Sequence, residues 1–575
     1  QKDLYNKISF TLEDDVHCAF IGTNGTGKST LVDMILHPDN YLYDGRLIVD
    51  VPGRIGYVSQ FYSLDEEKEV TVFDYLSEEF VRLQNEINTI CDEMATADEL
   101  DELMDRYQNV MDQFQAIDGD FYESNIRKQL KIANLKDYEN HLLTNLSGGE
   151  FKLIQVIREM MISPKFIIMD EPDVFLDFEH LNALKNLINS HKGTLLVITH
   201  NRYLLNHCFN KILHLENAEL QEFDGTYVDY NFALLEMKIE QQELAAADME
   251  EIERNRKIVE RLRNEATKVD SATKGRSLKA RVSLLERLEA RKTKSPFVDI
   301  KQPQIELHTS AKSSDDVQGD VSGQKDTDEA TSEERMEQNH EKVILEVENY
   351  SVAFDRQIME EVIFSMEAGE KVAIVGPNGT GKTTILRDIY KNNNPAIKLA
   401  PDLKVAYLSQ MHGEVFDEKE TVLKNFEDAG FETDAGIVRY LETYGFEEEL
   451  VYNKVENLSG GEKNLLQLAK ISRMDADFLL LDEPTSHLDT YSQLALEQAI
   501  EKYEGAVLMV SHDFYTVANC MDYVLFVEEK KLRKMSIRKF RKMIYADHFD
   551  KNYLELEQKK KELENRISFA LQAGK

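Results

Sequence analysis

The sequence predicts an α/β protein that contains two copies of one domain, joined by an α-helical hairpin. Two observations predict this class. Short apolar runs that end in glycine-rich loops are followed by helical periods. A set of motifs also occurs twice in the same order, which is typical of a duplicated domain. The chain of 575 residues is long enough for several domains.

The repeat consists of five motifs. They are the glycine loops Gly22–Thr30 (GTNGTGKST) and Gly376–Thr384 (GPNGTGKTT), the Ser-Gln pairs at 59–60 and 409–410, the LSGGE segments at 146–150 and 458–462, the Asp-Glu-Pro segments at 170–172 and 482–484, and the histidines His200 and His512. The interval from Gln60 to Ser147 is longer than that from Gln410 to Ser459, so the first copy carries an insertion.

Composition along the chain predicts its organisation. We expect a first domain at 1–226 with a helical acidic insertion at about 78–123, a helical hairpin at 227–300, a disordered acidic linker at 301–341, a second domain at 342–529 and a short charged helical tail at 530–575. The second copy has an aromatic residue, Phe354, before its glycine loop. The first copy has no room for a counterpart and opens on Gln1, so we expect an N-terminal truncation.

Charge and cysteine usage limit the classes of function. The formal net charge of −38 argues against a protein that coats nucleic acid over its whole surface. No apolar run approaches the roughly 20 residues of a membrane-spanning helix. The four cysteines show no CxxC spacing, which favours a reducing compartment over a disulfide framework. We therefore expect a cytoplasmic protein without membrane insertion.

Both glycine loops fit the pattern G-x-x-x-x-G-K-[ST] between an apolar strand and a helix. Backbone N–H groups of such a loop wrap phosphates, and the helix N-terminus adds positive potential. Lys28 and Lys382 would reach the β- and γ-phosphates, and Ser29 and Thr383 would hold Mg²⁺. The predicted nucleotide contacts of the loops are Gly22, Asn24, Gly25, Gly27, Lys28, Ser29 and Thr30, and Gly376, Asn378, Gly379, Gly381, Lys382, Thr383 and Thr384.

Two apolar runs end in paired carboxylates, Asp170-Glu171 and Asp482-Glu483. The aspartate of each pair would lie near Mg²⁺, and the glutamate could accept a proton from an attacking water. An acidic turn after a core strand is the simpler interpretation of each run alone. The neighbouring phosphate loops favour the catalytic one.

Each LSGGE segment opens a helix, and its serine and glutamate could form a helix cap. With the other motifs, however, the sequence resembles ATP-binding cassette domains, whose signature motif LSGGE matches. This resemblance implies that two cassettes pair head to tail. Ser147 and Gly149 would then face the ATP at Lys382, while Ser459 and Gly461 would face the ATP at Lys28. It also implies that Gln60 and Gln410 contact nucleotide and Mg²⁺, that His200 and His512 are catalytic switch histidines, and that Phe354 contacts nucleotide.

Two cassettes on one chain, without a membrane segment and with a charged helical linker, resemble the ABC-F family. The resemblance implies a Mg²⁺-dependent ATPase that acts on the ribosome as a monomer, through large-subunit rRNA and P-site tRNA. Translation factors and antibiotic-resistance factors both fit it. The ATP-hydrolysing subunit of a membrane transporter is the alternative. A DNA-repair ATPase would instead show zinc CxxC pairs or longer coils, which are missing here.

Charge by segment supports an RNA contact. Residues 254–294 carry 14 Lys or Arg against five acids, on a chain that is otherwise acidic. A solvated helix face is the simpler interpretation. The acidic insertion should avoid RNA. The predicted RNA-binding residues at the hairpin tip are Lys268, Lys274, Arg276, Lys279 and Arg281.

The two copies differ after their Asp-Glu-Pro segments. The second copy continues Thr-Ser-His-Leu-Asp, whereas the first continues with Asp173, Val174 and Phe175 before Leu-Asp. This difference predicts two unequal sites.

Overall fold

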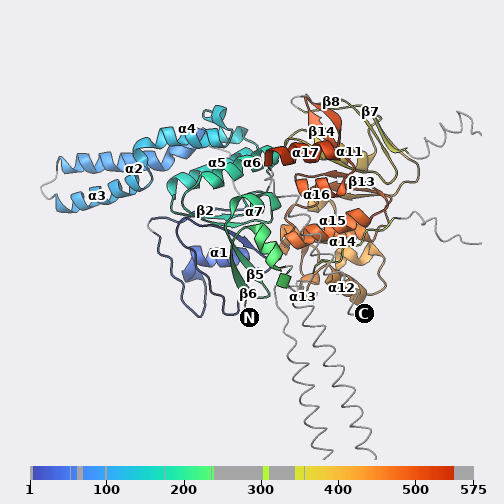
Figure 1. Ribbon diagram of the computed structural model, residues 1–575, viewed down its shortest axis with the longest axis horizontal. Coiled ribbons are helices and arrows are strands. Elements are labelled where there is room, and N and C mark those ends of the chain that lie inside the picture. The colour runs from blue at the N-terminus through green and yellow to red at the C-terminus, as the bar shows by residue number, and fades with distance from the viewer. Residues whose placement is uncertain are drawn as a thin grey trace, which may run out of the picture.

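The computed structural model describes residues 4–51, 53–60, 69–96, 100–174, 176–234, 236–237, 302–309, 343–354 and 357–548. The two copies of the repeat lie side by side, the first in blue to green and the second in yellow to red (Figure 1). The five predicted RNA-binding residues and most of the predicted hairpin lie outside the described residues. No helix of the described ranges is long and apolar enough to cross a membrane.

The first copy is built on a six-stranded sheet in the order β2-β3-β4-β1-β5-β6, parallel except for the last strand. Its central strands are buried on both faces, which explains their continuous apolar sequences. The glycine loop and Asp170-Glu171 both follow carboxyl ends of this sheet. The strands are β1 (His17–Ile21), β2 (Gly56–Val58), β3 (Phe166–Asp170), β4 (Thr194–Ile198), β5 (Lys211–Glu216) and β6 (Glu219–Asp224).

The second copy repeats this strand order as β11-β12-β13-β9-β14-β15 and adds a three-stranded antiparallel sheet, β10-β7-β8. The identical order in the two sheets confirms the predicted duplication of an α/β domain. The strands are β7 (Val343–Ala353), β8 (Gln357–Glu367), β9 (Lys371–Val375), β10 (Ile397–Leu399), β11 (Val405–Leu408), β12 (Phe478–Asp482), β13 (Ala506–Val510), β14 (Tyr523–Glu528) and β15 (Lys531–Ser536).

Helices pack against both sheets. The glycine loops lead into α1 (Lys28–Leu36) and α11 (Lys382–Lys391), and the LSGGE segments open α5 (Gly148–Ile162) and α14 (Gly460–Ser472). Ser147 and Ser459 form capping boxes with glutamates three residues on, as the sequence allows. The remaining helices of the two cassettes are α6 (Phe178–Ser190), α7 (Arg202–Cys208), α12 (Asp434–Thr443), α13 (Glu448–Val451), α15 (Thr490–Lys502), α16 (Phe514–Cys520) and α17 (Ile537–His548).

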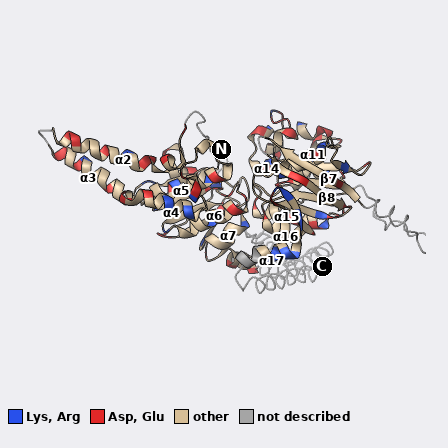
Figure 2. Cartoon of the chain, turned by 90° about the horizontal axis from the view of Figure 1, so that it is seen from above, with Lys and Arg blue, Asp and Glu red and all other residues tan. Residues whose placement is uncertain are grey.

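A helical arm projects from the first cassette (Figure 1). It consists of α2 (Val72–Met94) and α3 (Asp101–Ala116), with α4 (Tyr122–Ile132) at its base. Phe80, Ile90, Val110 and Phe114 are buried within it. Many of its residues are acidic, and they are coloured red along the arm in Figure 2. The predicted insertion at about 78–123 falls largely within α2 and α3.

Three predicted boundaries differ from the structure. Residues 302–309 were expected in the disordered linker, but Ile305 is buried in the second core and Gln304 N donates to Thr443 O. Strand β15 extends the second cassette to Ser536, because it pairs with β14 along its whole length. In the first cassette, Tyr227 and Tyr230 belong to the core, although residue 226 was the expected end. Buried apolar residues supply the contacts in the first and third cases, and strand pairing supplies them in the second.

A buried arginine joins the two cassettes. Arg202 Nη2 of α7 contacts Glu497 Oε1 of α15 and lies 2.8 Å from Asp513 Oδ2. Only 11% of the arginine side chain is exposed. Burial disfavours its charge, but the two carboxylates outweigh burial and raise the pKa of Arg202. Beside it, the rings of Phe178 and Phe514 meet edge to face at 4.5 Å between centroids.

Replacing Arg202 with methionine should lower the stability of the cassette pair by about 3–5 kcal/mol, because two buried carboxylates would lose their counter-ion. Urea unfolding followed by circular dichroism measures this. The matched control is Arg82→Met, since Arg82 forms ion pairs with Glu79 and Glu86 on the exposed arm and should contribute about 1 kcal/mol or less. Equal losses from the two variants would contradict the role of Arg202.

Candidate nucleotide sites between the cassettes

The glycine loops hold their lysines inside the loop. Lys28 Nζ donates to the carbonyl oxygens of Gly22 and Thr23, each at 2.9 Å. Lys382 Nζ donates to those of Gly376 at 2.8 Å and Pro377 at 2.7 Å. Burial lowers the pKa of both ammonium groups. Each loop therefore presents a buried cation at the start of a helix, which suits a phosphate ligand.

Both loops depend on glycine for their shape. Gly27 and Gly381 cap the following helices in the left-handed region, at φ 96° and 84°. A side chain would be strained in this conformation, whereas glycine adopts it freely. The loops can therefore turn their N–H groups toward one centre.

A hydroxyl and a carboxylate lie together beside each lysine. Thr383 Oγ1 donates to Asp482 Oδ1 at 3.1 Å, and the Ser29 side chain hydrogen-bonds Asp170 in the same way. Asp482 Oδ2 is buried without a hydrogen-bond partner among the described residues. Burial also raises the pKa of Asp482 to about 6.

These atoms fit Mg²⁺. The ion binds one or two protein oxygens and completes its octahedron with water and phosphate oxygens, so a carboxylate with one unpartnered oxygen beside a hydroxyl is a suitable pair. No group of three or more His, Cys, Asp or Glu side chains that could hold a metal occurs in the part of the chain that the structure describes. The hydroxyl–carboxylate pair supplies two oxygens, so it suits an ion whose other ligands are water and phosphate oxygens.

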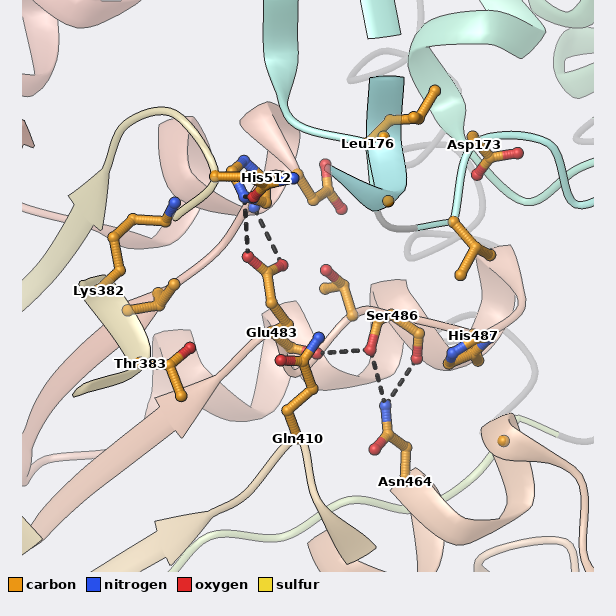
Figure 3. A pocket seen from close by; sticks show the side chains of 18 of the residues that line it. Asp173, Leu176, Lys382, Thr383, Gln410, Asn464, Glu483, Ser486, His487 and His512 are labelled. Atoms are coloured by element: carbon orange, nitrogen blue, oxygen red, sulfur yellow. Dashed lines mark hydrogen bonds and ion pairs between the residues drawn. The ribbon is translucent and has the colours of Figure 1, made fainter. Parts of the chain in front are cut away.

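Glu171 and Glu483 have left-handed backbones, at φ 45° and 49°. Such conformations are costly for residues other than glycine and occur often at active sites. Glu483 Oε2 accepts from His512 N at 3.1 Å, and His512 Nε2 lies 3.4 Å from Oε1 (Figure 3). Burial raises the pKa of Glu483 to about 8 and lowers that of His512 to about 3.

Glu171 has different surroundings. Gln60 Nε2 donates to Glu171 Oε2 at 2.5 Å, and His487 Nδ1 of the other cassette lies 3.4 Å from the same oxygen. Burial alone would raise the pKa of Glu171, but the hydrogen bond with His487 and the charges of His200 and Lys28 lower it. Burial lowers the pKa of His200 to about 4.

The cassettes face each other head to tail. Asn24 N in the first glycine loop donates to Asp489 Oδ2 at 3.1 Å, and Asn378 N in the second donates to Asp177 Oδ2 at 2.9 Å. The second LSGGE segment lies directly on the first glycine loop, since a Cβ added to Gly461 would come within 2.0 Å of Asn24 Nδ2. Each loop thus meets the opposite cassette.

A pocket of about 930 Å³ lies around Lys382, and both cassettes line it. Ser147 to Gly149 come from the first cassette and Lys382, Thr383 and Gln410 from the second, partly visible in Figure 3. Of the predicted site residues, it brings together Ser147, Gly149, Glu171, His200, Phe354, Asn378, Gly379, Gly381, Lys382, Thr383, Thr384, Gln410, Glu483 and His512. Gly376 and Asp482 also belong to the Lys382 side, where they contact Lys382 and Thr383. The remaining predicted nucleotide and metal residues belong to the Lys28 side, where glycine loop and LSGGE segment touch.

Sequence reasoning missed four contact residues. Asp177 and Asp489 recur at the same spacing after Asp-Glu-Pro, so the repeat itself could have identified them. Tyr5 donates its hydroxyl to Gly27 O at 2.6 Å, but its position offers no recognisable pattern. His487 lies in the segment where the two copies differ, but its contact with the opposite cassette is long-range and the sequence pattern does not indicate it.

Comparisons with known proteins agree with this architecture. The profile of the family described as ABC transporter matches residues 5–174 and 359–486, and a second profile with the same description matches 213–307. The energy-dependent translational throttle protein EttA of Escherichia coli is 27% identical over 98% of this chain and 93% of its own. The ATP-binding protein Uup of the same organism is 26% identical over 90% of this chain and 76% of its own.

Among solved structures, an archaeal ribosome recycling factor, aABCE1, in complex with the ribosomal stalk protein aP1, matches with a TM-score of 0.51. Its sequence is 18% identical, and the match covers 93% of this chain and 89% of that one. At this sequence identity the match supports the tandem fold and nothing beyond it. The chain belongs to the ATP-binding cassette family. Its similarity to EttA and Uup over nine-tenths or more of its length supports membership of the ABC-F group.

Proposed function

We propose that this chain binds and hydrolyses ATP, with Mg²⁺, at two composite sites and uses the cycle to act on the ribosome. The observation that carries the proposal is the head-to-tail interface between the two cassettes, which we call the seam. There the N-terminus of an LSGGE helix on one cassette faces three features of the other. These are a buried lysine, a hydroxyl–carboxylate pair and a glutamate with a left-handed backbone.

Each residue of the Lys382 site has a separate role in binding or hydrolysing ATP. Lys382 and the loop N–H groups bind the phosphates of ATP, and the N-terminus of α5, opened by Ser147, adds donors from the opposite side. Glu483 accepts the proton of the attacking water, and His512 holds the glutamate in place. Thr383 and Asp482 would hold Mg²⁺, which would supply charge neutralisation at the phosphates. Lys28, Ser29, Asp170 and Glu171 act in the same way at the other site.

Action on the ribosome has two supports. One relative of similar length is named as a translational throttle protein. The segment at 254–294 also has a strong excess of basic residues in an acidic chain, which suits phosphate contacts with rRNA or tRNA. Because the segment follows the first cassette directly, closure of the cassettes on ATP would move it.

The double variant Glu171→Gln, Glu483→Gln should still bind ATP but hydrolyse it about 10²–10⁴-fold more slowly, because the water loses its proton acceptor. Phosphate release and equilibrium binding of a fluorescent ATP analogue measure the two properties. The matched control replaces the exposed Glu179 and Glu501 with glutamine, and it should hydrolyse ATP at the parental rate. A double variant with parental turnover would contradict the assignment of the base.

Reversing the charge of Lys268, Lys274, Arg276, Lys279 and Arg281 to glutamate should weaken ribosome co-sedimentation and leave ATP binding intact. Each phosphate contact contributes about 0.7 to the salt slope for single strands, so the log–log slope should become shallower by roughly 3.5. The matched control reverses five exposed basic residues on β15, α17 and the turn before them, namely Lys530, Lys534, Arg538, Lys539 and Lys542. An equal effect of both reversals, or none, would contradict a specific role of the hairpin.

A further inference from the structure

The two proposed bases receive different partners. Glu483 is held by His512 of its own cassette, through the backbone N–H and the ring. Glu171 contacts Gln60 of its own cassette and, in addition, His487 of the other. The Lys28 site thus contains a side chain from the opposite cassette in direct contact with its glutamate.

His487 is held firmly for this contact. Its backbone is left-handed at φ 59°, and its carbonyl oxygen accepts from Asn24 Nδ2 at 2.8 Å. Two residues later, Asp489 accepts from Asn24 N at 3.1 Å. The loop that carries His487 is therefore docked on the glycine loop of the Lys28 site, and only 16% of the histidine side chain is exposed. Its ring reaches Glu171 only while the two cassettes are together.

The repeat has no second histidine for the Lys382 site. The position of His487, the third residue after Asp-Glu-Pro, is occupied in the first copy by Phe175. Phe175 lies outside the described residues, but a phenyl ring offers no hydrogen-bond donor wherever it is placed. Glu483 therefore cannot receive the same hydrogen bond from the first cassette.

The geometry points to His487 as a positioning residue that orients the Glu171 carboxylate across the seam, at one of the two ATP sites only. Gln60 and His487 both meet Oε2 of Glu171. Oε1 is then the oxygen turned to accept the proton of the attacking water. With the proton on its Nδ1, His487 donates to Oε2, and this fixes the carboxylate rotamer. The inference rests on the proposed hydrolysis and predicts that turnover at Lys28 requires a correctly closed seam.

Single-site variants test this role. In a Glu483→Gln background, the Lys28 site supplies the turnover. There, His487→Phe, which copies the residue of the first cassette, should lower kcat about tenfold to a hundredfold with KM for ATP unchanged within about twofold. His487→Asn should restore most of the loss, because asparagine Nδ2 can replace histidine Nδ1 as a donor. Steady-state phosphate release gives both constants.

The same substitution in a Glu171→Gln background completes a double-mutant cycle. If His487 acts through Glu171, its replacement by phenylalanine should cost less than about threefold there, because the carboxylate that it orients has already been removed. A merely structural role of His487 would instead disturb the seam and lower turnover in both backgrounds alike.

The outcomes separate the two proposals. A parent protein that does not hydrolyse ATP would overturn the proposed hydrolysis itself. A hydrolysing parent whose Glu483→Gln form is unaffected by His487→Phe would overturn the positioning role alone. Equal losses for His487→Phe and His487→Asn, or a raised KM in place of a lowered kcat, would also overturn it. Binding of a non-hydrolysable ATP analogue verifies that each variant is folded.

Discussion

The docking of each glycine loop on an aspartate of the opposite cassette is the constraint on which the site geometry depends. Asn24 N binds Asp489, and Asn378 N binds Asp177, with distances of 3.1 and 2.9 Å. These two bonds place the LSGGE helices over the opposing lysines. Neither cassette alone contains a complete site, because the N–H groups of the LSGGE helix come from its neighbour. A chain that carries both cassettes keeps the two halves at high effective concentration.

The two copies also differ at the interface between the cassettes. Arg202, two residues after His200, corresponds in the repeat to Phe514 of the second copy. Arg202 pairs with Asp513 across the interface, whereas Phe514 packs against Phe178. Likewise, His487 of the second copy corresponds to Phe175 of the first. The buried ion pairs of Arg202 hold α7 against α15 and the loop after β13. They therefore connect the segments that follow both predicted switch histidines. The two proposed bases therefore have different contacts, although the two six-stranded sheets have the same strand order.

Sequence reasoning predicted the duplicated fold because its signals are local. A glycine loop between a strand and a helix, or an apolar run ending in Asp-Glu, needs no knowledge of distant residues. The contacts that it missed are long-range ones, such as the approach of His487 to Glu171. The ordered 302–309 segment was missed for a related reason, since its polar composition gave no sign that Pro303 and Ile305 are buried. Head-to-tail pairing was inferred from the family resemblance, because spacing within one chain does not fix it.

The central claim is that each site combines a glycine loop from one cassette with an LSGGE segment from the other. The substitution Ser459→Arg tests it most directly. With Glu483→Gln, only the Lys28 site can hydrolyse ATP, and Ser459→Arg should abolish turnover because it blocks that site from across the seam. With Glu171→Gln, the Lys382 site works with Ser147, and Ser459→Arg should leave turnover within about twofold of its background. The opposite pattern, with loss only in the Glu171→Gln background, would show that each LSGGE segment serves its own cassette and would contradict the account.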